Sequence, residues 1–234
     1  MKDSDPAKSH FDEYAVDYDS ALAQGISVSG ESKDYFAQGR VEWLQTQLKR
    51  LGRHPASILD FGCGVGTNTP FLLQLPGVTS VLGVDLSAAS LDVARRATSD
   101  GRAAFSVLDQ FKPQGSHDLV FTNGVFHHIP PPERADAVDY IRRALRPGGL
   151  FAFWENNPWN PGTRYVMSRI PFDRDAITLS APEAQRLVRA AGFRVLRTDF
   201  QFIFPKAVAP LRKLEPLLAR LPFGAQYQVL CEKE

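Results

Sequence analysis

The chain has 234 residues, of which 44% are hydrophobic, enough for one α/β domain with a sizeable core. Its 27 basic and 26 acidic residues are interspersed and leave a formal net charge of +1, so no basic stripe for nucleic acid stands out. Residues 1–12 are charged and lack the apolar stretch of a signal peptide, and no apolar run is long enough to span a membrane. Together with two distant cysteines, Cys63 and Cys231, these features favour a cytoplasmic protein with reduced thiols.

Residues 1–52 are expected to form an N-terminal lid and a first helix. Three aromatic residues within residues 11–18 recur at three- and four-residue spacing, which places them on one helical face. That face is either a packing stripe or a lid whose Tyr14 reaches a ligand. A helix is predicted over residues 32–51, because apolar residues recur at helical spacing and Gly52 follows as a stop signal.

A glycine-rich turn follows the next predicted element. The short apolar run over residues 57–61, bounded by proline and glycine, predicts a buried strand. Gly62, Gly64 and Gly66 then tolerate φ > 0 and let a ligand approach the backbone closely. Residues 68–73 are typical of a helix start. A strand, a glycine turn and a helix N-terminus together form a cofactor cradle, because the free N–H groups there favour anionic groups.

The spacing of the turn indicates which cofactor it accepts. A dinucleotide-binding turn would carry a third glycine where this chain has Thr67. The chain instead has Gly-x-Gly-x-Gly, with Asp60 two residues before the first glycine and the small residue Cys63 inside the turn. This pattern resembles the first motif of the class I S-adenosylmethionine-dependent methyltransferases. The resemblance implies S-adenosylmethionine as the cofactor and S-adenosylhomocysteine as its product, with the turn receiving the methionine part.

Acidic residues end the next two predicted strands. Asp85 lies about twenty residues beyond the glycine turn, followed by Leu86, and that spacing places a carboxylate against ribose hydroxyls in a βαβ unit. A solvent-facing aspartate is the alternative. The next strand ends at Asp109 and Gln110, where the resemblance implies an acid that accepts the adenine exocyclic N–H. A turn-forming aspartate is the alternative there.

The fourth strand, predicted over residues 116–121, leads into Asn123, His127 and His128. Strand ends of this kind carry sites in open α/β sheets. The resemblance implies that Asn123 contacts the cofactor and that the histidines contact cofactor or substrate. Adjacent histidines point in different directions and lack the four-residue spacing of a paired metal-ligand motif, so no metal is expected.

A second match to the family is Leu-x-Pro-Gly-Gly at residues 145–149, before a strand predicted over residues 150–154. Glu155 lies just past that strand, at the sheet edge where the cofactor sits. Glu155 and His128 are therefore the two candidate catalytic bases for the methyl acceptor. A structural role for Glu155, accepting backbone N–H groups of the following loop, is the alternative.

Two insertions interrupt the alternation of strands and helices. Residues 155–180 resemble the Glu-His-Asn-Pro-x-Asn-Pro segment of one subgroup, with Asn156 in place of the histidine, and are expected to roof the substrate pocket. The candidate pocket walls are His127, Trp154, Trp159, Tyr165 and Phe172, with plain core packing as the alternative for the aromatic residues. Residues 205–222 form a proline-interrupted helical insertion that caps the site or makes a subunit contact.

Residues 53–234 form the expected core within one domain overall. The pattern predicts an α/β, Rossmann-like sheet of seven strands, mostly parallel with one antiparallel strand and with helices on both faces. Arg40, in the helix before the first strand, either reaches the cofactor carboxylate or is solvated at the surface.

The resemblance implies transfer of a methyl group to an O, N or C nucleophile of a small molecule by in-line displacement. Two alternatives stay open. A nicotinamide-dependent oxidoreductase is disfavoured by Thr67 in the third glycine's place. A non-catalytic cofactor-binding partner subunit is disfavoured because every cofactor motif is intact. The sequence leaves the oligomeric state open.

Overall fold

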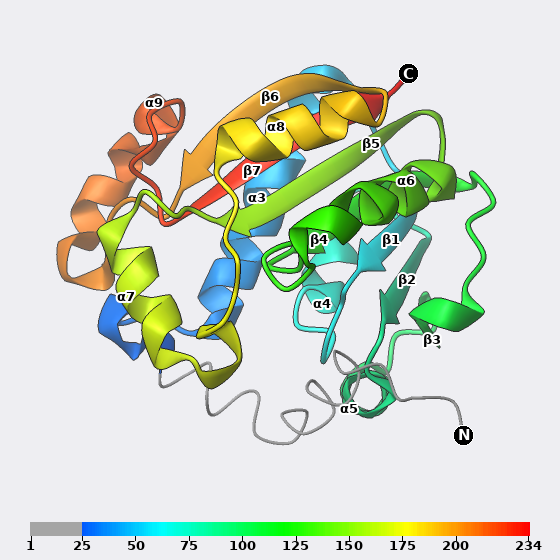
Figure 1. The fold of residues 1–234 in the computed structure, drawn as a ribbon, viewed down its shortest axis with the longest axis horizontal. Helices are drawn as coiled ribbons and strands as arrows, with labels where there is room; N and C mark the ends of the chain where they lie inside the picture. Colours follow the sequence, from blue (N-terminus) through cyan, green and yellow to red (C-terminus); the bar gives the residue numbers. More distant parts are fainter. Residues whose placement is uncertain (1–24) are drawn as a thin grey trace.

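The computed structural model describes residues 25–234, so the lid residue Tyr14 lies outside the described part. A seven-stranded sheet runs through it in the order β3-β2-β1-β4-β5-β7-β6 (Figure 1). In chain order the strands are β1 Ser57–Phe61, β2 Ser80–Asp85, β3 Ala103–Val107, β4 His117–Asn123, β5 Leu145–Asn156, β6 Phe193–Gln201 and β7 Gln226–Lys233. Strand β7 runs antiparallel to both neighbours, and the other pairs are parallel. The predicted mostly parallel α/β sheet is confirmed.

Helices cover both faces of this sheet. The helices are α3 Lys33–Leu51, α4 Thr69–Leu72, α5 Ala88–Ala97, α6 Arg134–Ala144, α7 Pro161–Arg169, α8 Ala181–Ala190 and α9 Glu215–Leu218. Short 3-10 segments are η1 Ser27–Ser29, η2 Leu108–Gln110, η3 Pro131–Glu133, η4 Pro171–Asp173 and η5 Lys206–Leu214. Helices α6 and α8 lie on one face, with Val138 and Val188 in its core, and α3 packs on the other through Leu44 and Leu48 (Figure 1).

Capping residues explain where the helices begin and end. The Ser32 side chain accepts from Tyr35 N at the start of α3, and Gly52, at φ 63°, ends that helix. Ser87 accepts from Ser90 N at the start of α5. A side-chain oxygen at these positions satisfies one of the N–H groups that a helix start leaves without a partner. The helix predicted over residues 32–51 is confirmed to within a residue.

Strand β6 ends earlier than residue 204, where the apolar run predicts its end. Phe202 has φ 62°, in the left-handed region, so the backbone leaves the sheet after Gln201. The N–H groups of Ile203 and Phe204 donate to Glu215 Oε1 at 3.1 and 2.9 Å instead of to a neighbouring strand. Apolar residues continue past Gln201, so the sequence predicts a longer strand. The two N–H groups are instead bonded to the buried Glu215 carboxylate and do not pair with the sheet.

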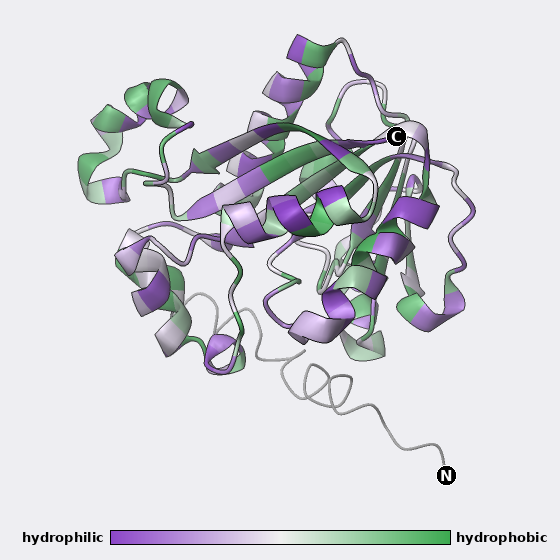
Figure 2. Cartoon of the chain, turned by 45° about the horizontal axis from the view of Figure 1, so that its top comes forward, coloured by the Kyte–Doolittle hydropathy of each residue, from purple (hydrophilic) through white to green (hydrophobic). Residues whose placement is uncertain are grey.

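The two insertions lie at the same end of the molecule, near α7 and α9 (Figure 1). Segment η5 is kinked at Val208 and contains Pro210, so the proline-interrupted insertion consists of 3-10 turns followed by the short helix α9. Much of this insertion has the colour of hydrophobic residues in Figure 2, and Leu217, in α9, is 80% exposed. Among residues 25–234, every helix is too short or too polar to cross a bilayer.

Candidate active site

The glycine turn adopts a backbone that glycine alone enters without strain. Gly62, Gly64 and Gly66 have φ of 71°, 52° and 79°. A Cβ on Gly62 would lie 2.4 Å from Val125, and one on Gly66 would lie 3.0 Å from Ala94 of α5. A Cβ on Gly64 would meet nothing within 4 Å. The outer glycines therefore allow close packing, while the middle one leaves room for a ligand above the turn.

Asp85 holds this turn from the end of β2. Its Oδ2 accepts from Gly64 N at 2.8 Å, and its Oδ1 accepts from Ser87 N at 2.9 Å. A carboxylate oxygen has two lone pairs, so each can still accept from a ligand hydroxyl. The structure thus places Asp85 where the sequence predicts a ribose contact.

Burial shifts the pKa values of two other side chains at the turn, Asp60 and Cys63. Asp60 is 1% exposed, and burial, helped by the nearby Asp85 charge, raises its pKa from 3.8 to about 7 against the opposing effect of Arg40. Burial raises the pKa of the Cys63 thiol well above its usual range, and the Asp60 and Asp85 charges raise it further. Because the thiolate is the reactive form of cysteine, this raised pKa disfavours Cys63 as a nucleophile.

A pocket of about 1240 Å³ opens beside this turn, at the carboxyl ends of β1, β2, β4 and β5. Pockets for a single small ligand measure about 300–1,000 Å³, so this one has room for a cofactor and an acceptor together. Among the predicted cofactor residues, those that line it are Arg40, Gly62, Cys63, Gly64, Asp85, Leu86 and Asn123.

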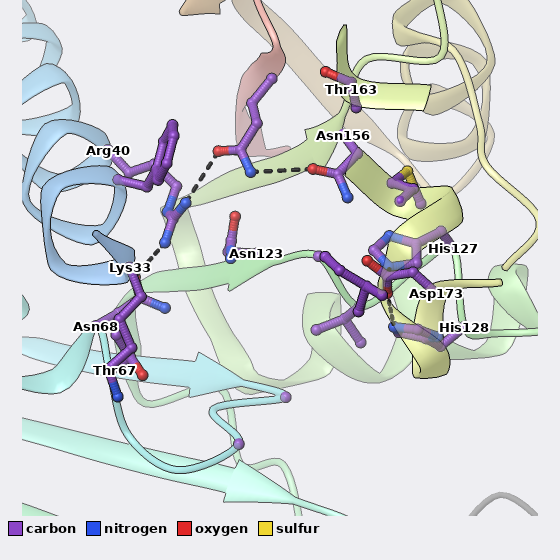
Figure 3. Close-up of a pocket in the computed structure, with 18 of the residues that line it drawn as sticks. Lys33, Arg40, Thr67, Asn68, Asn123, His127, His128, Asn156, Thr163 and Asp173 are labelled. Atoms are coloured by element: carbon purple, nitrogen blue, oxygen red, sulfur yellow. Dashed lines mark hydrogen bonds and ion pairs between the residues drawn. The ribbon is translucent and has the colours of Figure 1, made fainter. Parts of the chain in front are cut away.

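Arg40 is buried, so the surface interpretation of this residue is wrong. It is 5% exposed, and its guanidinium donates to Gln226 Oε1 at 3.0 Å and to Asn68 Oδ1 at 3.2 Å (Figure 3). The guanidinium therefore lies in the pocket beside the glycine turn, where it could bind an anionic group of the cofactor.

Other predicted cofactor residues lie around the pocket rather than in its wall. Asp60, in β1, and Gly66, the last glycine of the turn, do not line the pocket. Asp109 and Gln110 are exposed in η2, next to Leu108, which does line the pocket. The adenine contact of Asp109 stays a prediction.

The acceptor side of the pocket differs from its predicted walls. Phe172 and His127 line it, but Trp154 is fully buried in the core between the sheet and α3. Trp159 and Tyr165 are 52% and 50% exposed and lie outside the pocket wall. The structure contradicts these three expectations: Trp154 packs on the α3 side of the sheet, Trp159 lies in the turn before α7, and Tyr165 lies on a face of α7 that does not line the pocket.

The apolar wall comes instead from residues that the aromatic pattern does not single out. Helix α7 and the residue after it contribute Val166, Met167 and Ile170, and α3 contributes Phe36. The loop after β6 contributes Phe202, whose ring centroid lies 5.0 Å from that of Phe36. The i, i+1, i+4 spacing on α7 is a helical stripe that sequence reasoning could have used.

Three buried polar side chains and the partly exposed His128 lie beside this wall. Glu155 Oε2 bonds His127 Nδ1 at 2.7 Å, and its Oε1 accepts from Phe126 N at 2.7 Å. Asp173 Oδ1 lies 3.3 Å from both His127 Nε2 and His128 Nε2 (Figure 3). Glu155 is 1% exposed and does not line the pocket, so it lies behind His127 and does not face an acceptor.

Charge is concentrated in this cluster. Burial alone would lower the pKa of His127, but the Glu155 and Asp173 carboxylates outweigh burial and hold that pKa at about 10. Burial alone would raise the pKa of Asp173, but hydrogen bonds from His127 and His128 hold it at about 2. The same balance lowers the pKa of Glu155. Asp173 was missed in the sequence, because nothing local marks an aspartate in a loop as the partner of a histidine 46 residues away.

The pocket fits the cofactor that the sequence resemblance implies. Gly64 leaves open space for a close approach, and the carboxylate of Asp85 retains acceptor capacity. Asn123 Oδ1 is buried, and within the described residues no hydrogen-bond donor reaches it, as expected of an atom that accepts from a ligand.

Comparisons with known proteins agree with this geometry. Residues 58–149 match a family model described as a methyltransferase domain. A trans-aconitate 2-methyltransferase from Azoarcus sp. is 31% identical over 58% of this chain and 53% of its own length. One from Rhodopseudomonas palustris is 27% identical over 71% of this chain and 59% of its own length. The chain spans about half the length of the curated relatives it matches.

A solved structure shares the fold. Geranyl diphosphate C-methyltransferase from Streptomyces coelicolor, solved with Mg²⁺, geranyl diphosphate and S-adenosyl-L-homocysteine, superposes with a TM-score of 0.60. It is 20% identical, and the match covers 84% of this chain and 79% of that one. The motifs, the methyltransferase domain matched over residues 58–149 and the shared fold together support a class I S-adenosylmethionine-dependent methyltransferase.

Proposed function

We propose that this protein transfers a methyl group from S-adenosylmethionine to a small molecule that has a largely apolar body and an O, N or C nucleophile. The observation that carries the proposal is that the glycine turn with Asp85 and the apolar wall of Phe36, Met167 and Phe202 belong to one pocket. A cofactor held by the turn and an acceptor held by the wall would therefore meet inside it.

The chain's own residues do the positioning. Gly64 and Asp85 would hold the ribose and methionine parts of the cofactor, Arg40 its carboxylate, and Asn123 a hydrogen-bond donor. When bound, the cofactor supplies an electrophilic methyl carbon. The apolar wall excludes water and orients the acceptor, and positioning of this kind contributes a large share of the rate in bimolecular transfers.

His128 is the residue proposed to contact the acceptor's reacting group. It lines the pocket, and its side chain is 18% exposed. Glu155 is proposed as a positioning residue that acts through His127, because its carboxylate is enclosed behind that ring. The sequence treats Glu155 and His128 as equal candidates for the base, and this geometry favours His128.

An acidic acceptor is the second candidate. The trans-aconitate methyltransferases among the relatives favour it, as do Lys33 and Arg212 in the pocket wall. Against it, Arg212 already pairs with Glu31 at 2.9 Å. A carboxylate nucleophile is already ionised at neutral pH and needs no base, so His128 would matter little to its methylation.

An acceptor screen tests the proposal. Formation of S-adenosylhomocysteine would be measured with a panel of apolar alcohols, phenols, amines and enols, and with trans-aconitate, using wild type and Asp85→Ala. We expect turnover with a member of the apolar set, lost in Asp85→Ala. Turnover with trans-aconitate alone would favour the acidic acceptor, and cofactor binding without turnover on the whole panel would favour the non-catalytic subunit.

A further inference from the structure

One carboxylate oxygen faces two imidazole nitrogens in the pocket wall. Asp173 Oδ1 lies 3.3 Å from His127 Nε2 and 3.3 Å from His128 Nε2. One ligand-type atom from each of the three residues can be chosen so that all lie within 4.8 Å of one another. All three side chains line the pocket (Figure 3). The adjacent histidines therefore converge on one point, contrary to the expectation from sequence that they point apart.

The two contacts at Asp173 Oδ1 are long for charge-assisted hydrogen bonds, and their length also suits two ligands of one metal ion. A charge-assisted N–H···O bond is about 2.7–2.9 Å long, and the bond between His127 Nδ1 and Glu155 has that length, 2.7 Å. Ligand atoms about 2.0–2.1 Å from a tetrahedral zinc ion lie roughly 3.3–3.4 Å apart. Both separations at Asp173 Oδ1 match the second geometry.

Glu155 sets the orientation of His127 for such a role. Its carboxylate is fixed by Phe126 N at 2.7 Å and bonds the Nδ1 side of the His127 ring. A metal ion would displace the proton that His127 Nε2 shares with Asp173, while the hydrogen on Nδ1 stays bonded to Glu155 and leaves the Nε2 lone pair for the ion. A carboxylate behind a ligating imidazole is the outer-shell arrangement that orients metal-bound histidines.

We propose that His127, His128 and Asp173 bind a divalent transition metal ion of the zinc type, with Glu155 as the positioning residue behind His127. Two imidazoles and one carboxylate suit zinc and its neighbours, whereas magnesium and calcium prefer oxygen ligands alone. Three protein ligands leave a fourth position open to the pocket. A hydroxyl or anionic oxygen of the acceptor is the ligand class it would take, so that with the ion bound His128 would act on the acceptor through the ion and not as a free base. This role, unlike ion binding itself, rests on the proposed function.

Metal titration of the full-length protein tests the site. After dialysis against a chelator, Zn²⁺ binding would be measured by calorimetry, and Co²⁺ would be added as a spectroscopic probe. We expect one ion per chain and the visible absorption of tetrahedral Co²⁺. Asp173→Asn keeps the side-chain shape and is expected to weaken binding at least tenfold, and Glu155→Gln by about 10–100-fold. His54→Ala and Asp175→Asn, at exposed positions, are matched controls expected to bind as wild type does.

Circular dichroism would show whether each variant folds. If Asp173→Asn does not fold, His128→Gln, at the more exposed edge of the cluster, replaces it with the same expected loss. Absence of specific Zn²⁺ binding by wild type, or wild-type affinity in the folded variants, would overturn the proposal. S-adenosylmethionine affinity would be measured on the same metal-free samples. Zinc binding without cofactor binding would overturn the proposed function and leave the metal site standing.

Discussion

The Asp85 carboxylate accepts a hydrogen bond from Gly64 N at 2.8 Å, across the mouth of the glycine turn. The bond joins the end of β2 to the turn after β1, 21 residues earlier in the chain. Because Gly64 has open space above it, the same carboxylate both fixes the turn and faces the ligand that the turn would hold.

Asp85→Ala is predicted to weaken S-adenosylmethionine binding by roughly 1.5–3 kcal/mol, the scale of hydrogen bonds to a charged group. Titration calorimetry measures this loss. Asp92→Ala is the control, because Asp92 is exposed on α5 and pairs only with Arg95 among the described contacts. Wild-type affinity in Asp85→Ala would rule out the ribose contact.

Gly64→Ala is predicted to lower cofactor affinity at least tenfold, because a methyl group would occupy the space a ligand needs. The backbone at φ 52° adds about 1–2 kcal/mol of strain for alanine, measurable as a loss in the free energy of unfolding. Gly101→Ala, in open space outside the left-handed region, is expected to change affinity little. Equal cofactor affinities in Gly64→Ala and Gly101→Ala would contradict the claim that the cofactor approaches the backbone at Gly64.

Asp60→Asn is predicted to flatten the pH dependence of stability. The folded protein holds a proton on Asp60 up to about pH 7, whereas the unfolded chain releases it near pH 3.8. Between those values the folded state binds more protons, so this group's contribution to stability falls as pH rises. The free energy of unfolding would be measured by urea titration at pH 5 and pH 8, without cofactor. Relative to wild type, the free energy of unfolding of Asp60→Asn should be higher at pH 8 than at pH 5 by a few kcal/mol, at about 1.4 kcal/mol per pKa unit. A constant difference across pH would show that Asp60 ionises normally.

His128→Ala is predicted to lower kcat by about 10²–10⁴-fold with cofactor affinity unchanged, the range for loss of a group that handles the acceptor's proton or reacting atom. Glu155→Gln is expected to act differently. It breaks a buried charge pair with His127, so the free energy of unfolding should fall by about 3–5 kcal/mol. Steady-state kinetics and denaturant titration of both variants check this. Near-normal kcat in His128→Ala would mean that holding the acceptor next to the methyl group is sufficient for transfer, without a base.

Local backbone requirements explain why the cofactor side of the site was predictable. Each glycine of the turn is needed at its own φ, and the position of Asp85 follows from the length of one βαβ unit. Both signals are contained in adjacent residues. The antiparallel strand β7 also followed from the order of elements.

Tertiary packing explains why the acceptor side was not predictable. Aromatic content singled out Trp159 and Tyr165, but Trp159 lies in an exposed turn before α7, and α7 packs with Met167 inward and Tyr165 exposed. The partnership of Asp173 with His127 depends on where η4 returns to the end of β4, and no nearby residue encodes that contact. Contacts of this range are visible only once the chain is folded.

The most direct measurement is calorimetric titration of the purified full-length chain with S-adenosylmethionine, S-adenosylhomocysteine and NADH. We expect saturable 1:1 binding of S-adenosylmethionine and S-adenosylhomocysteine, weakened in Asp85→Ala and Gly64→Ala, and no binding of NADH. Saturable binding of NADH, with no heat from S-adenosylmethionine, would contradict the assignment of S-adenosylmethionine as the cofactor.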